Sequence, residues 1–290
     1  MTAQKILHAG RFRLSLDRPL VMGIVNVTPD SFSDGGRFLS CDSAVDHARH
    51  LIDEGADIID IGGESTRPGA AAVSSDEELH RVIDVVEQLA ATAVPISVDT
   101  RKPEVMRAAV AAGAVMVNDV NALRAPGAID AVAATDAAVC LMHIRGTPAS
   151  MQSNPVYADV VAEVRDYLLG RARSLMAAGV ARERIVLDPG FGFGKTLEHN
   201  VALLRRLDVY ASDGFPILAG VSRKSMIGTF TGRPANERLA GSVAAAIIAV
   251  QNGARIVRVH DVAATRDALA VLAGVESAAN AGIDRRPEIR

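Results

Sequence analysis

Residues 22–36 read Met22-Gly-Ile-Val-Asn26-Val-Thr-Pro29-Asp-Ser-Phe-Ser-Asp-Gly-Gly36, and this stretch decides the fold. It begins as a short apolar run of the kind that forms a strand buried on both faces, and at Asn26 it changes to a polar loop. Pro29 and the glycine pair at 35–36 favour sharp turns, so the loop should extend over the carboxyl end of the strand. If other strands end in the same way, their polar ends should meet.

Similar apolar runs recur along the whole chain. We predict strands at 21–26, 58–62, 95–99, 114–118, 138–143, 185–188, 216–222 and 255–260. Helix-like segments follow them at 43–54, 76–91, 103–112, 127–134, 158–178, 198–211, 237–252 and 262–279. The runs are rich in Val and Ile, and in none of them do apolar and polar residues alternate regularly. This favours parallel strands covered by helices. This pattern predicts an α/β fold, a single (β/α)8 TIM barrel. An open doubly wound sheet is the alternative, and it would place its site at a reversal of strand order.

Length and composition agree with one barrel. The 290 residues suit a single domain over 1–290, with an N-terminal extension at roughly 1–19. A hydrophobic fraction of 49% with 3% aromatic residues and no Trp predicts a core of small aliphatic side chains. A net charge of -3 gives no general attraction to nucleic acid or to an anionic membrane, so we expect neither as a partner.

The chain also carries no targeting pattern that we can identify. No run approaches the roughly 18 consecutive apolar residues of a membrane span, and the first twenty residues lack the apolar core of a secretion signal. Cys41 and Cys140 are far apart in the sequence and match no metal-ligand spacing, so we expect reduced thiols. We therefore expect a cytoplasmic protein.

Every predicted strand ends in a polar or ionisable group. In a TIM barrel these ends meet at one rim, where the active site normally lies. A single such residue is more often a turn former or a helix cap than a ligand, but eight of them on one rim favour a binding site. The groups are Asn26, Glu64, Asp99, Asn118, His143, Asp188, Ser222 and His260.

These groups indicate a ligand with two chemically different parts. Asp99, Asn118 and Asp188 suit a flat heterocycle with several N–H groups. Lys224, Arg258 and His260 are cationic donors from the last two strands, where such barrels often bind phosphate. We therefore predict an acidic end and a basic end.

The glycine-rich segment 190–196 is not a phosphate loop. Pro189 stands where that loop requires its first glycine. We interpret the segment as a wall that lets backbone approach a ligand, with Phe193 as either a stacking surface or an ordinary packing residue.

Two segments stand out in the sequence. They read Asn-Val-Thr-Pro-Asp-Ser-Phe-Ser-Asp-Gly-Gly at 26–36 and Gly-Ala-Asp-Ile-Ile-Asp-Ile-Gly-Gly-Glu-Ser-Thr-Arg-Pro-Gly at 55–69. Both closely resemble the signature segments of the dihydropteroate synthase family. The resemblance continues through the motifs at 97–100, 117–120, 142–143, 188–195, 222–225 and 258–261, so it spans essentially the whole chain.

The resemblance implies an enzyme of folate biosynthesis. The family condenses 6-hydroxymethyl-7,8-dihydropterin pyrophosphate with p-aminobenzoate, giving 7,8-dihydropteroate and pyrophosphate. Matching positions imply that the pterin pyrophosphate is bound by Thr66, Asp99, Asn118, Asp188, Phe193, Lys224, Arg258 and His260. Those implied for p-aminobenzoate are Thr66, Arg67, Pro68, Ser222 and Lys224. The resemblance further implies that Asn26 helps to hold Mg2+ on the diphosphate, that the enzyme is a homodimer, and that sulfonamides compete with p-aminobenzoate.

The residues suggest a dissociative displacement without a protein nucleophile. We expect Asp99, Asp188 and Lys224 to serve the chemical step, the two carboxylates favouring positive charge that develops on the dihydropterin. A pterin-dependent methyltransferase is one alternative, but it would lack a diphosphate site. A non-catalytic pterin-binding barrel should have lost some rim residues, and none is lost. A general phosphate-binding isomerase leaves the polar loop after Asn26 unexplained.

Overall fold

The computed structural model describes residues 5–27, 37–65, 72–147, 150–152 and 154–280, and within them eight parallel strands form one sheet. The strand order is β8-β7-β6-β5-β4-β3-β10-β9. A parallel bridge between Leu187 and Ile217 joins β8 to the residue before β9, so the sheet closes. The TIM barrel prediction is confirmed, and the open sheet is wrong. The strands are β3 (Leu20–Asn26), β4 (Ile58–Gly62), β5 (Ile96–Asp99), β6 (Met116–Asp119), β7 (Ala138–Met142), β8 (Ile185–Asp188), β9 (Leu218–Ala219) and β10 (Ile256–Val259).

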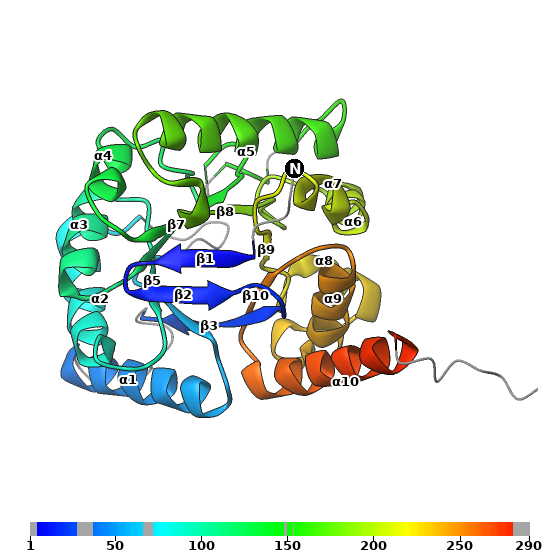
Figure 1. Ribbon diagram of the computed structural model, residues 1–290, viewed down its shortest axis with the longest axis horizontal. Coiled ribbons are helices and arrows are strands. Elements are labelled where there is room, and N and C mark those ends of the chain that lie inside the picture. Colours follow the sequence, from blue (N-terminus) through cyan, green and yellow to red (C-terminus); the bar gives the residue numbers. More distant parts are fainter. Residues whose placement is uncertain (1–4, 28–36, 66–71, 148–149, 153, 281–290) are drawn as a thin grey trace, which may run out of the picture.

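Helices surround the barrel, as Figure 1 shows. Three helices differ from the sequence prediction. The helix predicted at 43–54 begins six residues earlier, at Arg37. The helix predicted at 198–211 is two helices that meet at Arg206, and the helix Ser225–Thr231 was not predicted. The helices are α1 (Arg37–Asp53), α2 (Ser75–Leu89), α3 (Pro103–Ala112), α4 (Ala128–Ala133), α5 (Val160–Ala177), α6 (Leu197–Arg205), α7 (Leu207–Ala211), α8 (Ser225–Thr231), α9 (Leu239–Gln251) and α10 (Val262–Asn280), with short 3-10 turns at Arg182–Arg184 and Ala235–Glu237.

The strands are buried on both faces, which explains why their apolar residues do not alternate with polar ones. Outward residues such as Ile59, Val98 and Val117 belong to the core between sheet and helices. Inward residues near the strand starts, such as Met22 and Ile58, form a separate core inside the barrel. Polar side chains appear only further along the inner face, so the barrel interior changes from apolar to polar toward the carboxyl ends.

A hairpin covers the amino-terminal mouth of the barrel. Strands β1 (Ile6–Ala9) and β2 (Phe12–Ser15) pair antiparallel and lie across the centre of the view in Figure 1. Leu7 and Ala9 are fully buried in the same core as Met22 and Ile58. The turn uses Gly10 at φ 53, where an added Cβ would lie 2.9 Å from Val115 Cγ1. The predicted extension at 1–19 therefore contains a structural plug, and the polar groups lie at the opposite mouth.

Two other sequence expectations can be compared with the structure. Cys41 and Cys140 are both free thiols. Within the described residues, no helix is long and apolar enough to cross a membrane.

Candidate functional site

Strand register brings the predicted rim residues into one row. In the parallel pairs, Asn26 lies beside Gly62, Gly62 beside Asp99, and Asp99 beside Asn118. Asp188 ends β8 on the other side of β7, beside Met142. The rim predicted from the strand ends is therefore a continuous surface across β3, β4, β5 and β6.

Arg258 lies among the carboxylates of this rim. Its Nη2 donates to Asp99 Oδ2 at 2.8 Å, and its Nε donates to Asp60 Oδ2 at 2.6 Å. Burial disfavours the charged guanidinium, but Asp60 and Asp99 outweigh this effect and raise the pKa of Arg258. Burial raises the pKa of Asp99 to about 7, although Arg258 opposes that shift. The predicted division into an acidic end and a basic end is wrong for Arg258, because its side chain is long enough to reach β4 and β5.

Asp188, Lys224 and Phe193 form a second group. Asp188 Oδ1 accepts the Gly190 N–H at 2.7 Å, and burial raises the pKa of this carboxyl to about 6 against the effects of that N–H and of Lys224. The Lys224 ammonium lies 4.1 Å from the Phe193 ring centroid, a cation–π distance. Burial lowers the pKa of Lys224 to about 8, with Asp188 opposing. The side chain can therefore donate a hydrogen bond in its charged form near neutral pH.

The glycines after Asp188 are required by a neighbouring segment of backbone. Gly190 has φ 71, and an added Cβ would lie 2.0 Å from the His143 carbonyl oxygen. At Gly194 the added Cβ would lie 2.5 Å from the Arg145 carbonyl oxygen. The glycines at 190 and 194 therefore allow close packing against the segment that follows β7, whereas the sequence interpretation of this segment, a wall that lets backbone approach a ligand, stays a prediction.

Lys195 holds the glycine-rich segment in place through hydrogen bonds to its backbone. Its buried ammonium lies 2.9 Å from the Gly190 carbonyl oxygen, 3.0 Å from that of Phe193 and 3.0 Å from Nδ1 of His143. Neither His143 nor Lys195 has a predicted ligand role, and these contacts assign Lys195 to holding the segment that presents Phe193.

Ser222 and His260 lie side by side, with Ser222 Oγ 3.0 Å from His260 Nδ1. The turn that follows Ser222 contains Arg223, a non-glycine residue at φ 57. The Arg223 guanidinium pairs with Asp261. Its N–H donates to Ser242 Oγ at 2.9 Å. These bonds stabilise a backbone conformation that an L residue rarely adopts, and so fix Ser222 and Lys224 on either side of it.

Known proteins resemble this chain along nearly its full length. The family model described as pterin-binding enzyme matches residues 22–260. A dihydropteroate synthase of Neisseria meningitidis serogroup C is 55% identical over 272 residues, which cover 92% of this chain and 96% of that protein. The chain belongs to the dihydropteroate synthase family.

Solved dihydropteroate synthases share the fold. The enzyme of Xanthomonas albilineans with 4-aminobenzoic acid has a TM-score of 0.90 and 56% identity, covering 95% of this chain and 99% of that one. The enzyme of Burkholderia cenocepacia complexed with 7,8-dihydropteroate has a TM-score of 0.88 and 54% identity, with coverages of 96% and 98%.

Asn26, the residue predicted to bind Mg2+, lies at the end of β3. The next residue, Val27, donates its N–H to the Gly62 carbonyl at 2.8 Å, which fixes the strand end. Across the described part of the chain, no group of three or more His, Cys, Asp or Glu side chains could hold a metal. A single carboxamide oxygen fits Mg2+, which takes few protein ligands and completes its shell with phosphate oxygens and water.

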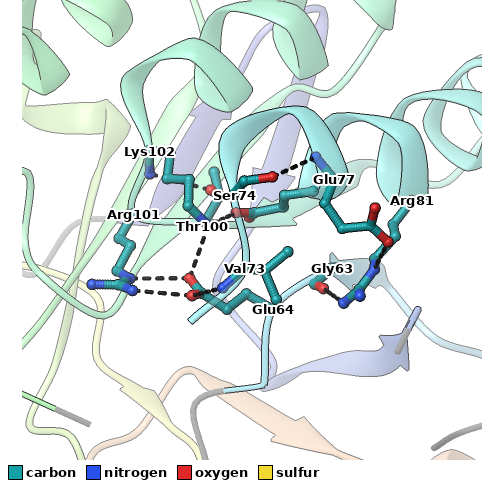
Figure 2. A network of polar contacts seen from close by, with 10 residues as sticks. Gly63, Glu64, Val73, Ser74, Glu77, Arg81, Thr100, Arg101 and Lys102 are labelled. Carbon is teal, nitrogen blue, oxygen red and sulfur yellow. Dashed lines mark hydrogen bonds and ion pairs between the residues drawn. The ribbon is translucent and has the colours of Figure 1, made fainter. Parts of the chain in front are cut away.

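Thr66, Arg67 and Pro68, predicted for p-aminobenzoate, lie outside the described residues. Glu64, before this segment, binds Val73, after it. Glu64 had no assigned role in the sequence prediction. The Glu64 carboxylate accepts the Val73 N–H at 3.1 Å and two hydrogen bonds from the Arg101 guanidinium, each at 3.0 Å. Figure 2 shows how these groups lie around Glu64. Lys102 pairs with Glu64 at 3.1 Å and also with the buried Glu78. Burial opposes ionisation of Glu64, but these donors lower its pKa to about 2.

The sequence prediction did not include Asp60, which contacts Asn118 and Arg258. The residue interrupts the apolar run Ile58-Ile59-Asp60-Ile61 two positions before Gly62, so it shares the inner face with the rim. That spacing is the signal that could have identified it.

Proposed function

We propose that this enzyme binds and activates its substrates with the groups that converge on the barrel rim. As a dihydropteroate synthase, it is a transferase that condenses 6-hydroxymethyl-7,8-dihydropterin pyrophosphate with p-aminobenzoate and releases pyrophosphate. The observation that carries the assignment is the row of Asp99 and Asn118 with Asp188 and Lys224 beside it. Such a set of acceptors and one donor matches the N–H and carbonyl edges of a pterin.

The pterin is held by Asp99, Asn118 and Asp188 as acceptors or mixed partners, with Lys224 donating to the ring. Phe193 forms a flat apolar wall next to Lys224, which supports its role in pterin binding. The carboxylates also favour the positive charge that develops on the dihydropterin as the bond to the diphosphate stretches. Asp99, Asp188 and Lys224 are accordingly the proposed catalytic residues.

The leaving diphosphate is assigned to Arg258 and His260. Arg258 retains donors beyond the two nitrogens that bind Asp60 and Asp99, because a guanidinium carries five N–H groups. Asn26 would hold Mg2+ on the diphosphate, where the cation would neutralise negative charge on the leaving group.

The attacking p-aminobenzoate is assigned to Ser222 and Lys224 on the rim, together with Thr66, Arg67 and Pro68 from outside the described residues. The 3.0 Å contact between Ser222 and His260 supports this arrangement, because the amine and the diphosphate must both lie near the pterin methylene carbon. No protein nucleophile is required.

A homodimer is also proposed. Neighbouring helices α8, α9 and α10 expose large apolar side chains, which supports a second copy of the chain as their partner. These side chains are Phe230, Leu239, Ile248, Val271 and Val275. Sedimentation equilibrium tests the proposal: the dimer should dissociate in Phe230→Glu, and a monomeric wild type would contradict it. We further propose a cytoplasmic location, supported by the two free thiols.

One assay tests the function. Purified protein receives the dihydropterin pyrophosphate and Mg2+, with and without p-aminobenzoate, and both pyrophosphate and dihydropteroate are measured. Product that depends on both substrates is expected. A protein that binds the pterin but forms no dihydropteroate would instead point to a methyltransferase or to a non-catalytic pterin-binding protein.

A further inference from the structure

Asp60 is the most deeply buried carboxylate that contacts the proposed pterin-binding groups. Its relative exposure is 0%, and its Oδ2 accepts from Arg258 Nε at 2.6 Å and from Asn118 Nδ2 at 3.0 Å. Among the described residues, its other oxygen has no hydrogen-bond partner. The cost of burying this charge is therefore offset through one oxygen and two donors, and both donors belong to the proposed site.

The contacts join elements that are not adjacent in the sheet. Arg258 starts on β10 and reaches past β3 to Asp60 on β4, while Asn118 reaches Asp60 from β6 across β5. The Asp60 carboxylate binds the Nε edge of the guanidinium, while Nη2 of the same group binds Asp99. It also fixes the Asn118 amide, because the Nδ2 donates to Asp60 and the carbonyl oxygen must point away from it.

We infer that Asp60 is a positioning residue for the pterin substrate, acting through Arg258 and Asn118 and not by contact with the reacting atoms. Without its charge, Arg258 would pair more fully with Asp99 and compete with the pterin N–H groups for that carboxylate. The inference rests on the proposed roles of Asp99, Asn118 and Arg258.

The test compares Asp60→Asn with a matched control, Ser97→Ala. Asparagine preserves size and can still accept from both donors, so this change removes mainly the charge. Ser97 pairs with Asp60 in the β4–β5 register, is equally buried, and its Oγ has no partner among the described residues. Both variants are checked for cooperative thermal unfolding before kinetics.

The expected result is selective. In Asp60→Asn the KM for the dihydropterin pyrophosphate and the Kd for 6-hydroxymethylpterin should rise about tenfold or more, as for loss of a charge-assisted bond. The KM for p-aminobenzoate should stay within about twofold, because no proposed contact to that substrate involves Asp60. Ser97→Ala should match the wild type.

The same substitution in an Arg258→Ala enzyme tests whether Asp60 acts through Arg258. In Arg258→Ala, the added Asp60→Asn change should raise the pterin KM much less than it does in the wild type, because its main partner is absent. Equal effects in the two backgrounds, or equal rises in both KM values, would overturn the inference. A wild type that makes no dihydropteroate would instead contradict the proposed function, so the two failures are distinguishable.

Discussion

The ammonium of Lys195 lies 3.0 Å from Nδ1 of His143, and both side chains are buried. A charged ammonium only donates, so Nδ1 must accept and the ring proton must sit on Nε2. Burial lowers the pKa of His143 to about 3, and the positive charge of Lys195 adds to that shift. His143 is therefore neutral at physiological pH, and Lys195 joins it to the glycine-rich segment that carries Phe193.

This protonation state can be measured by 15N NMR of the imidazole ring. His143 should show the shifts of a neutral Nε2–H ring at about pH 5 to 6, below the Lys195 pKa of about 7, where the ammonium is charged. In Lys195→Met its pKa should rise but stay below 6.5, because burial remains. A wild-type ring that titrates near 6.5, or a Lys195→Met variant with an unchanged pKa, would contradict the assignment.

The barrel could be predicted from the sequence because eight apolar runs and eight helix-like segments alternate. The hairpin was missed because Ile6–Ala9 and Phe12–Ser15 are short, and their burial depends on contacts with distant residues such as Val115. The helix Ser225–Thr231 is only seven residues long and follows a short strand, so its segment carried little helical periodicity.

The site was predictable where a residue ends a strand and not where a side chain reaches far. Asp99, Asn118 and Asp188 lie where their positions in the sequence indicate. The location of Arg258 among carboxylates depends on the length of its side chain and on the order of β10, β3, β4 and β5, which a sequence pattern does not specify. Asp60 was missed because it lies inside an apolar run, although its position two residues before Gly62 places it on the inner face of the strand.

The Glu64 network should stabilise the fold in a pH-dependent manner. The folded pKa of about 2 lies below the ordinary 4.5, so the stabilisation is present above about pH 4.5 and is lost as pH falls toward 2. Glu64→Gln should lower the free energy of unfolding by roughly 2 kcal/mol at pH 7 and by much less near pH 3. Urea unfolding at the two pH values measures this difference.

Glu77→Gln is the control for Glu64. Glu77 pairs with Arg81 on α2 at 3.2 Å, but its side chain is 40% exposed, so its loss should cost less than about 1 kcal/mol. Figure 2 shows both carboxylates in the same network. Equal destabilisation by the two variants, or a Glu64→Gln effect that does not change with pH, would show that the buried network is not the cause.

Asn26 should control the requirement for Mg2+. Asn26→Ala removes the proposed carboxamide ligand at the end of β3, and the Mg2+ concentration for half-maximal activity should rise about tenfold. The KM for p-aminobenzoate, measured at saturating Mg2+, should change little. The Asn26 assignment is wrong if the Mg2+ dependence of the variant matches that of the wild type while its overall activity falls.

Lys224 should set the alkaline limb of the pH profile. Its pKa is lowered to about 8 by burial, and the neutral amine would donate to the pterin more weakly, so kcat/KM for the dihydropterin pyrophosphate should fall as pH rises above about 8. Lys224→Arg should have lower activity at pH 7.5, because the geometry differs. Its kcat/KM should not fall up to about pH 10, since a guanidinium stays charged.

Lys195 is the control for this assignment. Burial lowers its pKa to about 7, but its hydrogen bonds go to the backbone of the glycine-rich segment, as at Gly190. Lys195→Met should therefore retain the limb near pH 8, and a limb that disappears in Lys195→Met but persists in Lys224→Arg would assign the titration to Lys195.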